Sequence, residues 1–263
     1  MHSNLLSCTH KSRIMKKTIS TLFIAFMAFG SFAQQKVLFK LAPENNKPIK
    51  YEMINKMDID GPQTLIMDMI MHMDLTYVET GDTSINVSGK YSYAKVDLDA
   101  GMMTASYDSS KEPTTDMEKM FAQQFKPLLE NTLTYSMNKF GKINDVDFPN
   151  VSDQLFDKSS VNSFGVTYPT NPIAVGDSWT SENTMEQMGV KAKGKYTLVE
   201  KTAAGYKIDS DVILEDASGT SVGTSKGHFI VHPKSFITVS SSTVTSIEMQ
   251  GASIKTTTEL KSM

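Results

Sequence analysis

The chain has 263 residues, of which 40% are hydrophobic, 21% charged and 9% aromatic, and its formal net charge is −3 at pH 7. This composition is typical of a globular domain and excludes a collagen, a coiled coil and a disordered tail. Arg13 is the only arginine, so bidentate recognition of phosphate or guanine is not available to the rest of the chain. Because a net negative chain also repels polyanions, we expect no nucleic-acid partner.

Residues 1–33 are predicted to be a cleavable signal peptide. Lys16 and Lys17 form a short basic region, an apolar run covers residues 22–29, and small residues close the segment. The apolar run is shorter than the roughly 20 residues that a membrane-spanning helix needs, so we expect no spanning segment. A methionine directly precedes the two lysines, which leaves open that residues 1–14 are an upstream start artefact. Cleavage would remove four basic and no acidic residues and lower the net charge to −7.

The cysteine content supports a periplasmic or secreted protein without a lipid anchor. Cys8 is the only cysteine and lies in the segment to be removed, and Gln34 stands where a lipoprotein would carry its cysteine. We therefore expect no disulfide and no thiol chemistry in the mature protein. Residues 34–263 are expected to form a single β-rich domain, with a candidate seam at residues 165–177.

Three strands are predicted at the start of the mature chain, over residues 50–60, 64–78 and 85–97. The second alternates apolar and polar residues with a period of two, which is typical of a half-buried antiparallel strand. One of its faces carries Leu65, Met67, Met69, Met71, Met73, Leu75 and Tyr77, and the other carries Asp68, His72, Asp74 and Thr76.

A helix is predicted over residues 115–129, because Thr115 and Glu118 have the spacing of a capping box. Its apolar stripe consists of Met117, Met120, Phe121, Phe125 and Leu128. Pro127 is expected to distort or end this helix. Residues 132–139 and 142–147 are predicted to form a hairpin, and residues 151–161 a shorter helix.

The rest of the chain is predicted to consist almost wholly of β-strands. The candidate strands cover residues 179–190, 193–201, 206–215, 228–232, 236–249 and 253–260, and residues 249–252 have the character of a hairpin turn. Many antiparallel strands with few helices indicate an α+β fold. We expect a strongly curved, mainly antiparallel, half-barrel-like sheet with one or two helices on its concave side.

The methionine row allows two interpretations. Exported segments rich in thioether sulfur are able to bind Cu(I), and strand spacing would place alternate sulfurs in one row. Methionine also lines cores and grooves, because its unbranched side chain adapts to irregular neighbours. His72 points to the other face of the strand, which favours the core or groove interpretation.

Other candidate sites favour structure over chemistry. His228 and His232 lack a third ligand at zinc-site spacing, and no metal or other cofactor is expected. Residues 223–227 match the G-x-S-x-G pattern of a hydrolase nucleophile, but a strand follows them where that site needs a helix. No nucleophile, base and acid can be assembled, so we do not expect an enzyme.

The segment from Pro172 through Val175, Gly176 and Asp177 to Trp179 has the pattern Pro-x-x-Val-Gly-Asp-x-Trp. From the residues alone it is a turn followed by a large apolar side chain at a strand start. The pattern resembles an uncharacterised, exported, β-rich family of Gram-negative bacteria, a domain of unknown function, and the resemblance would cover most of the mature chain. The family implies no catalytic residues. By analogy of fold it is similar to curved-sheet proteins that carry lipids or lipoproteins across the periplasm.

The function expected first is binding of an apolar, lipid-like small molecule in a groove between the strand row and the helix stripe. The groove residues are Leu65, Met67, Met69, Met71, Met73, Leu75, Met117, Met120, Phe121 and Phe125. Two alternatives remain open. One is a structural or interaction protein of the cell envelope, whose Ser/Thr-rich strand at residues 235–246 presents an edge or face to a protein partner. The other is a methionine-based Cu(I)-binding module.

Overall fold

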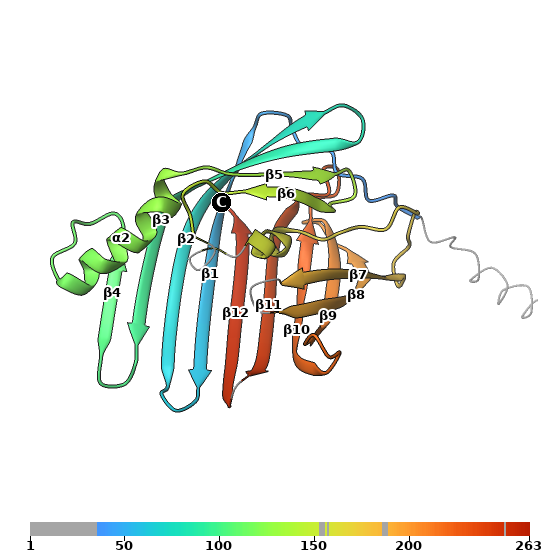
Figure 1. Cartoon of the computed structure of the whole chain (residues 1–263). Helices are drawn as coiled ribbons and strands as arrows, with labels where there is room; N and C mark the ends of the chain where they lie inside the picture. Colours follow the sequence, from blue (N-terminus) through green and yellow to red (C-terminus); the bar gives the residue numbers. More distant parts are fainter. Residues whose placement is uncertain (1–35, 153–155, 157, 186–188, 250) are drawn as a thin grey trace, which may run out of the picture. The chain divides into compact units, whose positions relative to one another are not determined.

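One antiparallel sheet of twelve strands contains most of the described chain, and an α-helix packs beside it (Figure 1). The structure is a computed structural model that describes residues 36–152, 156, 158–185, 189–249 and 251–263. The predicted signal peptide, residues 1–33, lies outside the described residues. Residues 36–263 form one compact unit.

The elements have the following bounds. The strands are β1 (Pro48–Asp60), β2 (Leu65–Thr80), β3 (Ser84–Asp99), β4 (Thr104–Asp108), β5 (Leu133–Asn138), β6 (Ile143–Asp147), β7 (Ser178–Met185), β8 (Val190–Lys201), β9 (Tyr206–Glu215), β10 (Ser221–Val231), β11 (Thr238–Met249) and β12 (Ala252–Ser262). The helices of the described part are α2 (Asp116–Glu130) and the 3-10 helix η1 (Lys158–Phe164).

The strand order is β6-β5-β3-β2-β1-β12-β11-β10-β9-β8-β7, and β4 pairs with β3 off this path. Neighbours in the sheet are mostly neighbours in sequence, but β1 pairs with β12 and so joins the two ends of the domain in mid-sheet. The long strands β1 to β3 run along one direction in Figure 1, whereas β5, β6 and β7 lie across them. Right-handed twist accumulated over many strands produces such a rotation.

The predicted antiparallel sheet with a helix is confirmed, but the fold is mainly β, with one α-helix in the described part, and not α+β. The half-barrel expected from the sequence is not found, because the sheet is neither strongly curled nor closed. Its edge strands β6 and β7 are not hydrogen-bonded to each other in the described structure, and both contact η1 instead. The alternation along single strands sets which side chains share a face, but closure depends on pairing between edges.

Most predicted elements lie within a few residues of the observed ones. The predicted hairpin around Gly141 is formed by β5 and β6, and the strand predicted at 206–215 is β9. Strand β4 was not predicted. Residues 153–155 and 157 of the helix expected at 151–161 lie outside the described residues, and η1 covers the end of that range. Pro127 lies inside α2 and does not end it, since the helix continues to Glu130. No helix of the described residues is both long and apolar enough to cross a membrane.

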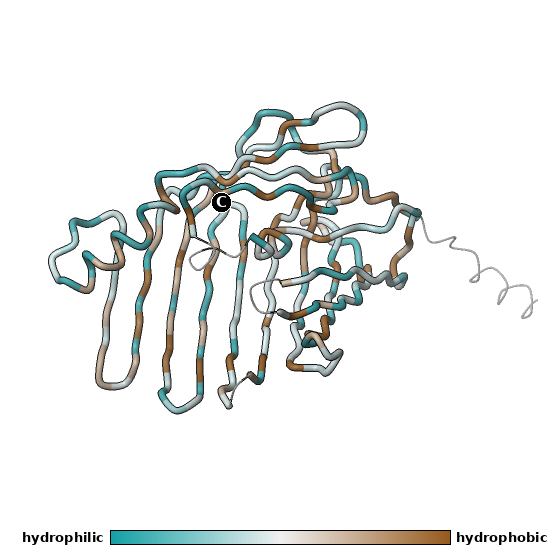
Figure 2. The backbone as a smooth tube through the Cα atoms, viewed as in Figure 1, coloured by the Kyte–Doolittle hydropathy of each residue, from teal (hydrophilic) through white to brown (hydrophobic). Residues whose placement is uncertain are grey.

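The two faces of the sheet differ sharply in chemistry. Helix α2 packs against β3 and β4 on the face that carries the methionine row, which we call the α2 face. The opposite face carries charged residues, including ion pairs of Lys95 with Asp97 at 2.7 Å and of Lys193 with Glu215 at 2.6 Å. Figure 2 shows hydrophobic residues recurring along β1, β2 and β3, as expected for strands with one buried face.

The Pro-x-x-Val-Gly-Asp-x-Trp segment forms the turn into β7. Gly176 has a φ of 95°, and Asp177 accepts a hydrogen bond of 2.9 Å from the backbone N–H of Ala174. Trp179 then stacks on Tyr196 at 5.7 Å and donates a hydrogen bond of 2.8 Å from Nε1 to the backbone oxygen of Thr167. The segment is therefore an architectural turn that anchors the edge strand β7.

Candidate ligand-binding site

The second half of α2 is packed against the sheet. Thr115 and Glu118 form the predicted capping box, which sets the start of the helix. Phe125 and Leu128 are buried, and Phe125 stacks on Tyr107 of β4 with ring centroids 5.8 Å apart. Phe121 is half-buried and lies 6.4 Å from the same ring. This end of the helix is core.

The first half of α2 leaves space beside the sheet. Met117 is half-buried, and Met120 keeps 44% of its surface exposed. A hollow of about 500 Å³ lies between this end of the helix and the edge formed by β3 and β4, a volume within the ~300–1,000 Å³ range of small-molecule sites. Its lining consists of Asp97, Leu98, Thr104, Ala105, Ser106, Thr115, Met117 and Glu118.

Hydrogen bonds to Glu118 tune its acidity at this hollow. Oε2 of Glu118 accepts from the backbone N–H groups of Thr114 and Thr115, at 2.6 and 2.9 Å, and from the Thr114 hydroxyl at 2.8 Å. These bonds favour the carboxylate and lower the pKa of Glu118 to about 2. The mouth of the hollow therefore carries a negative charge at neutral pH.

The methionine row passes from core to accessible surface along β2. Met71, Met73 and Leu75 are buried, whereas Leu65, Met67 and Met69 are only half-buried. Leu98 of β3 lies opposite Met67 and lines the hollow, so the half-buried part of the row is continuous with it. The buried part belongs to the main hydrophobic core together with Phe125.

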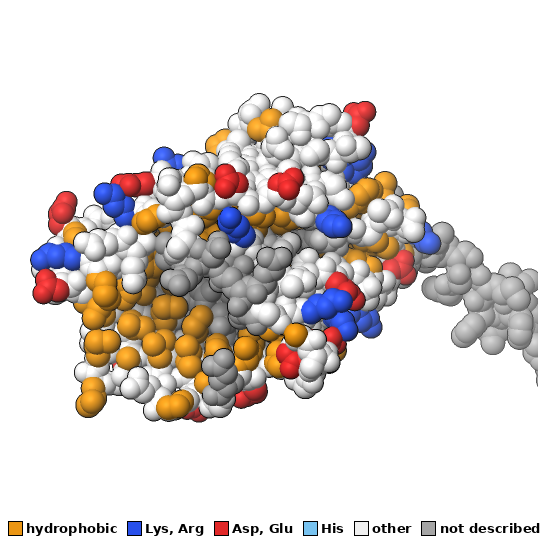
Figure 3. All heavy atoms as spheres, viewed as in Figure 1, with side chains coloured by type: hydrophobic (Ala, Val, Ile, Leu, Met, Phe, Trp, Pro, Cys, Tyr) orange, Lys and Arg blue, Asp and Glu red, His pale blue; other side chains and the backbone are white. Residues whose placement is uncertain are grey.

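Neighbouring strands extend this accessible apolar surface. On β1, Met57 lies opposite Met67, and Ile59 lies opposite Leu65. The space-filling view shows hydrophobic side chains gathered over the ends of β1 to β4 that lie away from β5 and β6 (Figure 3). Contiguous apolar patches on a protein surface mark interaction sites and ligand-binding grooves.

The sequence-based site is thus divided by the structure. Met71, Met73, Leu75 and Phe125 are buried in the core, while Leu65, Met67, Met69 and Met117 are half-buried at or beside the hollow. Met57, Ile59, Leu98 and Ala105 were not predicted to belong to it. Their alternation within β1, β3 and β4 is visible in the sequence, but only the register shows that they adjoin the methionine row.

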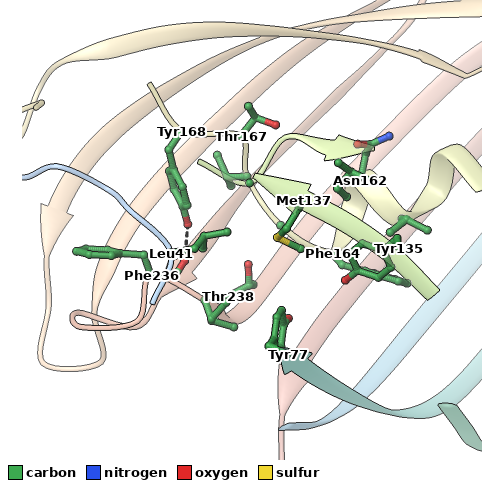
Figure 4. Close-up of a pocket in the computed structure, with 16 residues that line it drawn as sticks. Leu41, Tyr77, Tyr135, Met137, Asn162, Phe164, Thr167, Tyr168, Phe236 and Thr238 are labelled. Carbon is green, nitrogen blue, oxygen red and sulfur yellow. Dashed lines mark hydrogen bonds between the residues drawn. The ribbon is translucent and has the colours of Figure 1, made fainter. Parts of the chain in front are cut away.

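A second, smaller cavity lies at the other end of the sheet, among the side chains in Figure 4. It measures about 40 Å³, which is room for water and not for a lipid. Tyr77 and Tyr135 line it, and burial raises the pKa of both phenols. Tyr168 donates a hydrogen bond of 2.8 Å to the backbone oxygen of Phe236 there. This cavity is a structural feature of the core.

The other sequence candidates are placed as follows. Nε2 of His72 lies 3.5 Å from Glu52 on the face opposite the methionine row. Ser225 lies within β10, not at a strand-to-helix turn, and its Oγ accepts a hydrogen bond of 2.8 Å from Thr245. Among the described residues, no group of three or more His, Cys, Asp or Glu side chains gathers as a metal site would require. Strand β11 is paired on both sides, so it offers a partner only a face.

Part of the sequence matches the model of a known family. Residues 149–249 match the model of a family of unknown function, DUF6263. The matched region contains the Pro-x-x-Val-Gly-Asp-x-Trp segment, from which the sequence suggested such a family, and strands β7 to β11. The resemblance implied a match over most of the mature chain, but the family model covers only residues 149–249.

Two solved structures are similar to the chain at low identity. One is described as the crystal structure of a "putative outer membrane lipoprotein-sorting protein domain" from Vibrio parahaemolyticus, with 9% identity, a TM-score of 0.27, and coverage of 81% of this chain and 85% of that one. The other is a DUF1329 family protein from Desulfovibrio piger, with 8% identity, a TM-score of 0.29 and the same coverage. TM-scores this low carry no argument about ligand or fold. No curated protein matches the sequence.

Proposed function

We propose that this protein is an exported, non-enzymatic binding protein that holds an apolar chain on its α2 face. The observation that carries the proposal is the half-buried surface of Leu65, Met67, Met69 and Met57, continuous with the hollow of about 500 Å³ under the start of α2. Methionine side chains suit a flexible acyl chain, because they adapt to a ligand without a fixed shape. The signal peptide predicted at residues 1–33 supports export.

Purified protein titrated with an uncharged lipophilic fluorophore such as N-phenylnaphthylamine tests this function. Saturable enhancement of the emission is expected, together with lipid recovered by solvent extraction and detected by mass spectrometry. Absence of saturable binding in both measurements would contradict the proposal. Amino-terminal sequencing of the exported protein should begin at Gln34 if the predicted cleavage site is used.

A matched pair of variants locates the binding surface. Met67→Asp places a charge on the half-buried α2 face and is expected to weaken probe binding at least ten-fold, because apolar contact is replaced by a carboxylate that needs water. Ile66→Asp introduces the same charge next to it in sequence, on the opposite face, where Ile66 is 47% exposed. It should bind like the unmodified protein, and equal loss in both variants would place the ligand elsewhere.

Cu(I) binding is a second candidate, favoured by the cross-strand methionine pairs. Met53 lies opposite Met71 and Met57 opposite Met67, so methionines of two strands are cross-strand neighbours on the α2 face. The double variant Met67→Leu with Met69→Leu separates the two functions, since leucine keeps the apolar volume and removes the thioether. If the unmodified protein and the double variant both bind the probe and neither takes up copper, the apolar ligand is supported. Copper bound by the unmodified protein and lost in the variant supports the metal.

A further inference from the structure

The α2 face has a second part, in which hydroxyl and amide side chains replace the apolar row. Following the register from Met67 and Met57 across the sheet leads to Thr256, Thr245 and Ser225. The adjacent row leads from Met69 to three further polar side chains. These are Asn55, Thr258 and Thr243. We call the six polar residues of β1, β10, β11 and β12 the hydroxyl strip, and all six are half-buried.

The strip is unusual because these positions face the same side as the core. Polar groups on a buried face are favourable only where they find hydrogen-bond partners. Thr245 and Ser225 bond to each other at 2.8 Å. Oδ1 of Asn55, however, is shielded from solvent and has no hydrogen-bond partner among the described residues. A buried acceptor without a donor costs free energy, so this atom has an unused capacity to accept a hydrogen bond.

The surroundings of the strip exclude a charged head group. A register row is the set of residues that lie opposite one another on successive strands. No Lys, Asp or Glu occurs from β3 to β8 in the four rows of the α2 face that pass through Leu65, Met67, Met69 and Met71. An ionised group placed there would lose water without gaining a counter-charge. The nearest charge at the hollow on the α2 face, that of Glu118, is acidic and disfavours a carboxylate or phosphate.

The strip and the hollow lie on the same face of the sheet. From β11 to β4 the sheet crosses five strand spacings of about 4.8 Å, which amounts to ~24 Å, the scale of a long acyl chain. We propose that the ligand is an amphiphile with one long apolar chain and an uncharged, hydroxyl-bearing head group. The chain lies on the methionine row toward the hollow, and the head group donates to Asn55 and exchanges hydrogen bonds with Thr258 and Thr243. This proposal rests on the proposed function and specifies its ligand class.

Competition among ligands with the same chain tests the head group. Monooleoylglycerol, oleate and oleylamine are each used to displace N-phenylnaphthylamine from the purified full-length protein. Monooleoylglycerol is expected to compete at least ten-fold more strongly than the other two. Equal competition, or a preference for oleate or oleylamine, overturns the head-group proposal and leaves the apolar ligand face standing. Failure of the fluorophore to bind at all overturns the proposed function itself.

Variants of the strip connect the preference to these residues. Asn55→Leu and Thr258→Val remove hydrogen-bonding groups while keeping the same number of side-chain heavy atoms, and each should reduce the preference for monooleoylglycerol over oleate at least three-fold. Thr257→Val is the matched control, because its side chain lies on the opposite face of β12. If Asn55→Leu does not fold by circular dichroism, Thr243→Val serves in its place. An unchanged preference in the folded strip variants contradicts the assignment.

Discussion

Met69 of β2 and Asn55 of β1 lie directly opposite each other in the antiparallel register, and the boundary between the apolar and hydroxyl-bearing parts of the α2 face runs between them. Both side chains are half-buried. A single cross-strand pair therefore joins the surface proposed for an acyl chain to the surface proposed for a head group. The ligand needs contact with both, because the apolar part supplies affinity and the polar part selects among amphiphiles.

The buried and half-buried ends of the methionine row are expected to respond differently to truncation. Met73→Ala should destabilise the protein by about 2–5 kcal/mol, because Met73 is 1% exposed and its removal leaves a cavity. Met67→Ala should cost about 1 kcal/mol or less while weakening probe binding, since Met67 is half-buried beside the hollow. Urea denaturation measures both free energies. Equal losses of stability would show that the whole row is core.

Acidification should weaken the start of α2. The folded-state pKa of Glu118 is about 2 against an ordinary value of 4.5, because its carboxylate accepts hydrogen bonds from Thr114 and Thr115. A lowered pKa stabilises the fold above pH 4.5, and this contribution is lost as pH falls from 4.5 toward 2. Glu118→Gln should remove that part of the pH dependence, whereas Glu112→Gln, outside the helix, should keep it. Denaturation midpoints across this pH range give the comparison.

The hydrogen bond between Tyr51 and Thr238 is expected to contribute to the stability of mid-sheet. The Tyr51 hydroxyl donates to the backbone oxygen of Thr238 at 2.7 Å in a buried environment, linking β1 to the start of β11. Tyr51→Phe leaves that oxygen without its donor and should cost about 1–3 kcal/mol. Tyr107→Phe is the control, since its ring stacking on Phe125 does not need the hydroxyl. Similar losses in both variants would contradict this account.

Trp179 should stabilise the edge strand β7 through its ring nitrogen. Trp179→Phe keeps an aromatic ring beside Tyr196 but removes the 2.8 Å hydrogen bond to Thr167. A loss of about 1 kcal/mol is expected from the unpaired carbonyl. The variant has no tryptophan, so its unfolding is followed by far-ultraviolet circular dichroism. Unchanged stability would mean that stacking alone anchors the strand.

Local features of the fold were predictable from the sequence because their causes are local. Strict alternation in residues 64–78 set one face of β2, and the Thr115–Glu118 spacing set the start of α2. The turn before Trp179 followed from Gly176 and Asp177 in the same way. In each case the determining residues lie within a few positions of one another, so neighbouring side chains and backbone groups decide the conformation.

What covers the methionine row, by contrast, was decided only by tertiary structure. Phe125 at one end of α2 is buried in the same core as Met71, while Met117 at the other end is half-buried beside the hollow, and nothing in the helical stripe distinguishes the two. The hydroxyl strip likewise depends on the pairing of β1 with β12, which brings Asn55 beside Thr258 from about 200 positions away in the sequence. Sequence periodicity reports which side chains share a face of one strand. The order and register of all twelve strands decide which surface those faces form together.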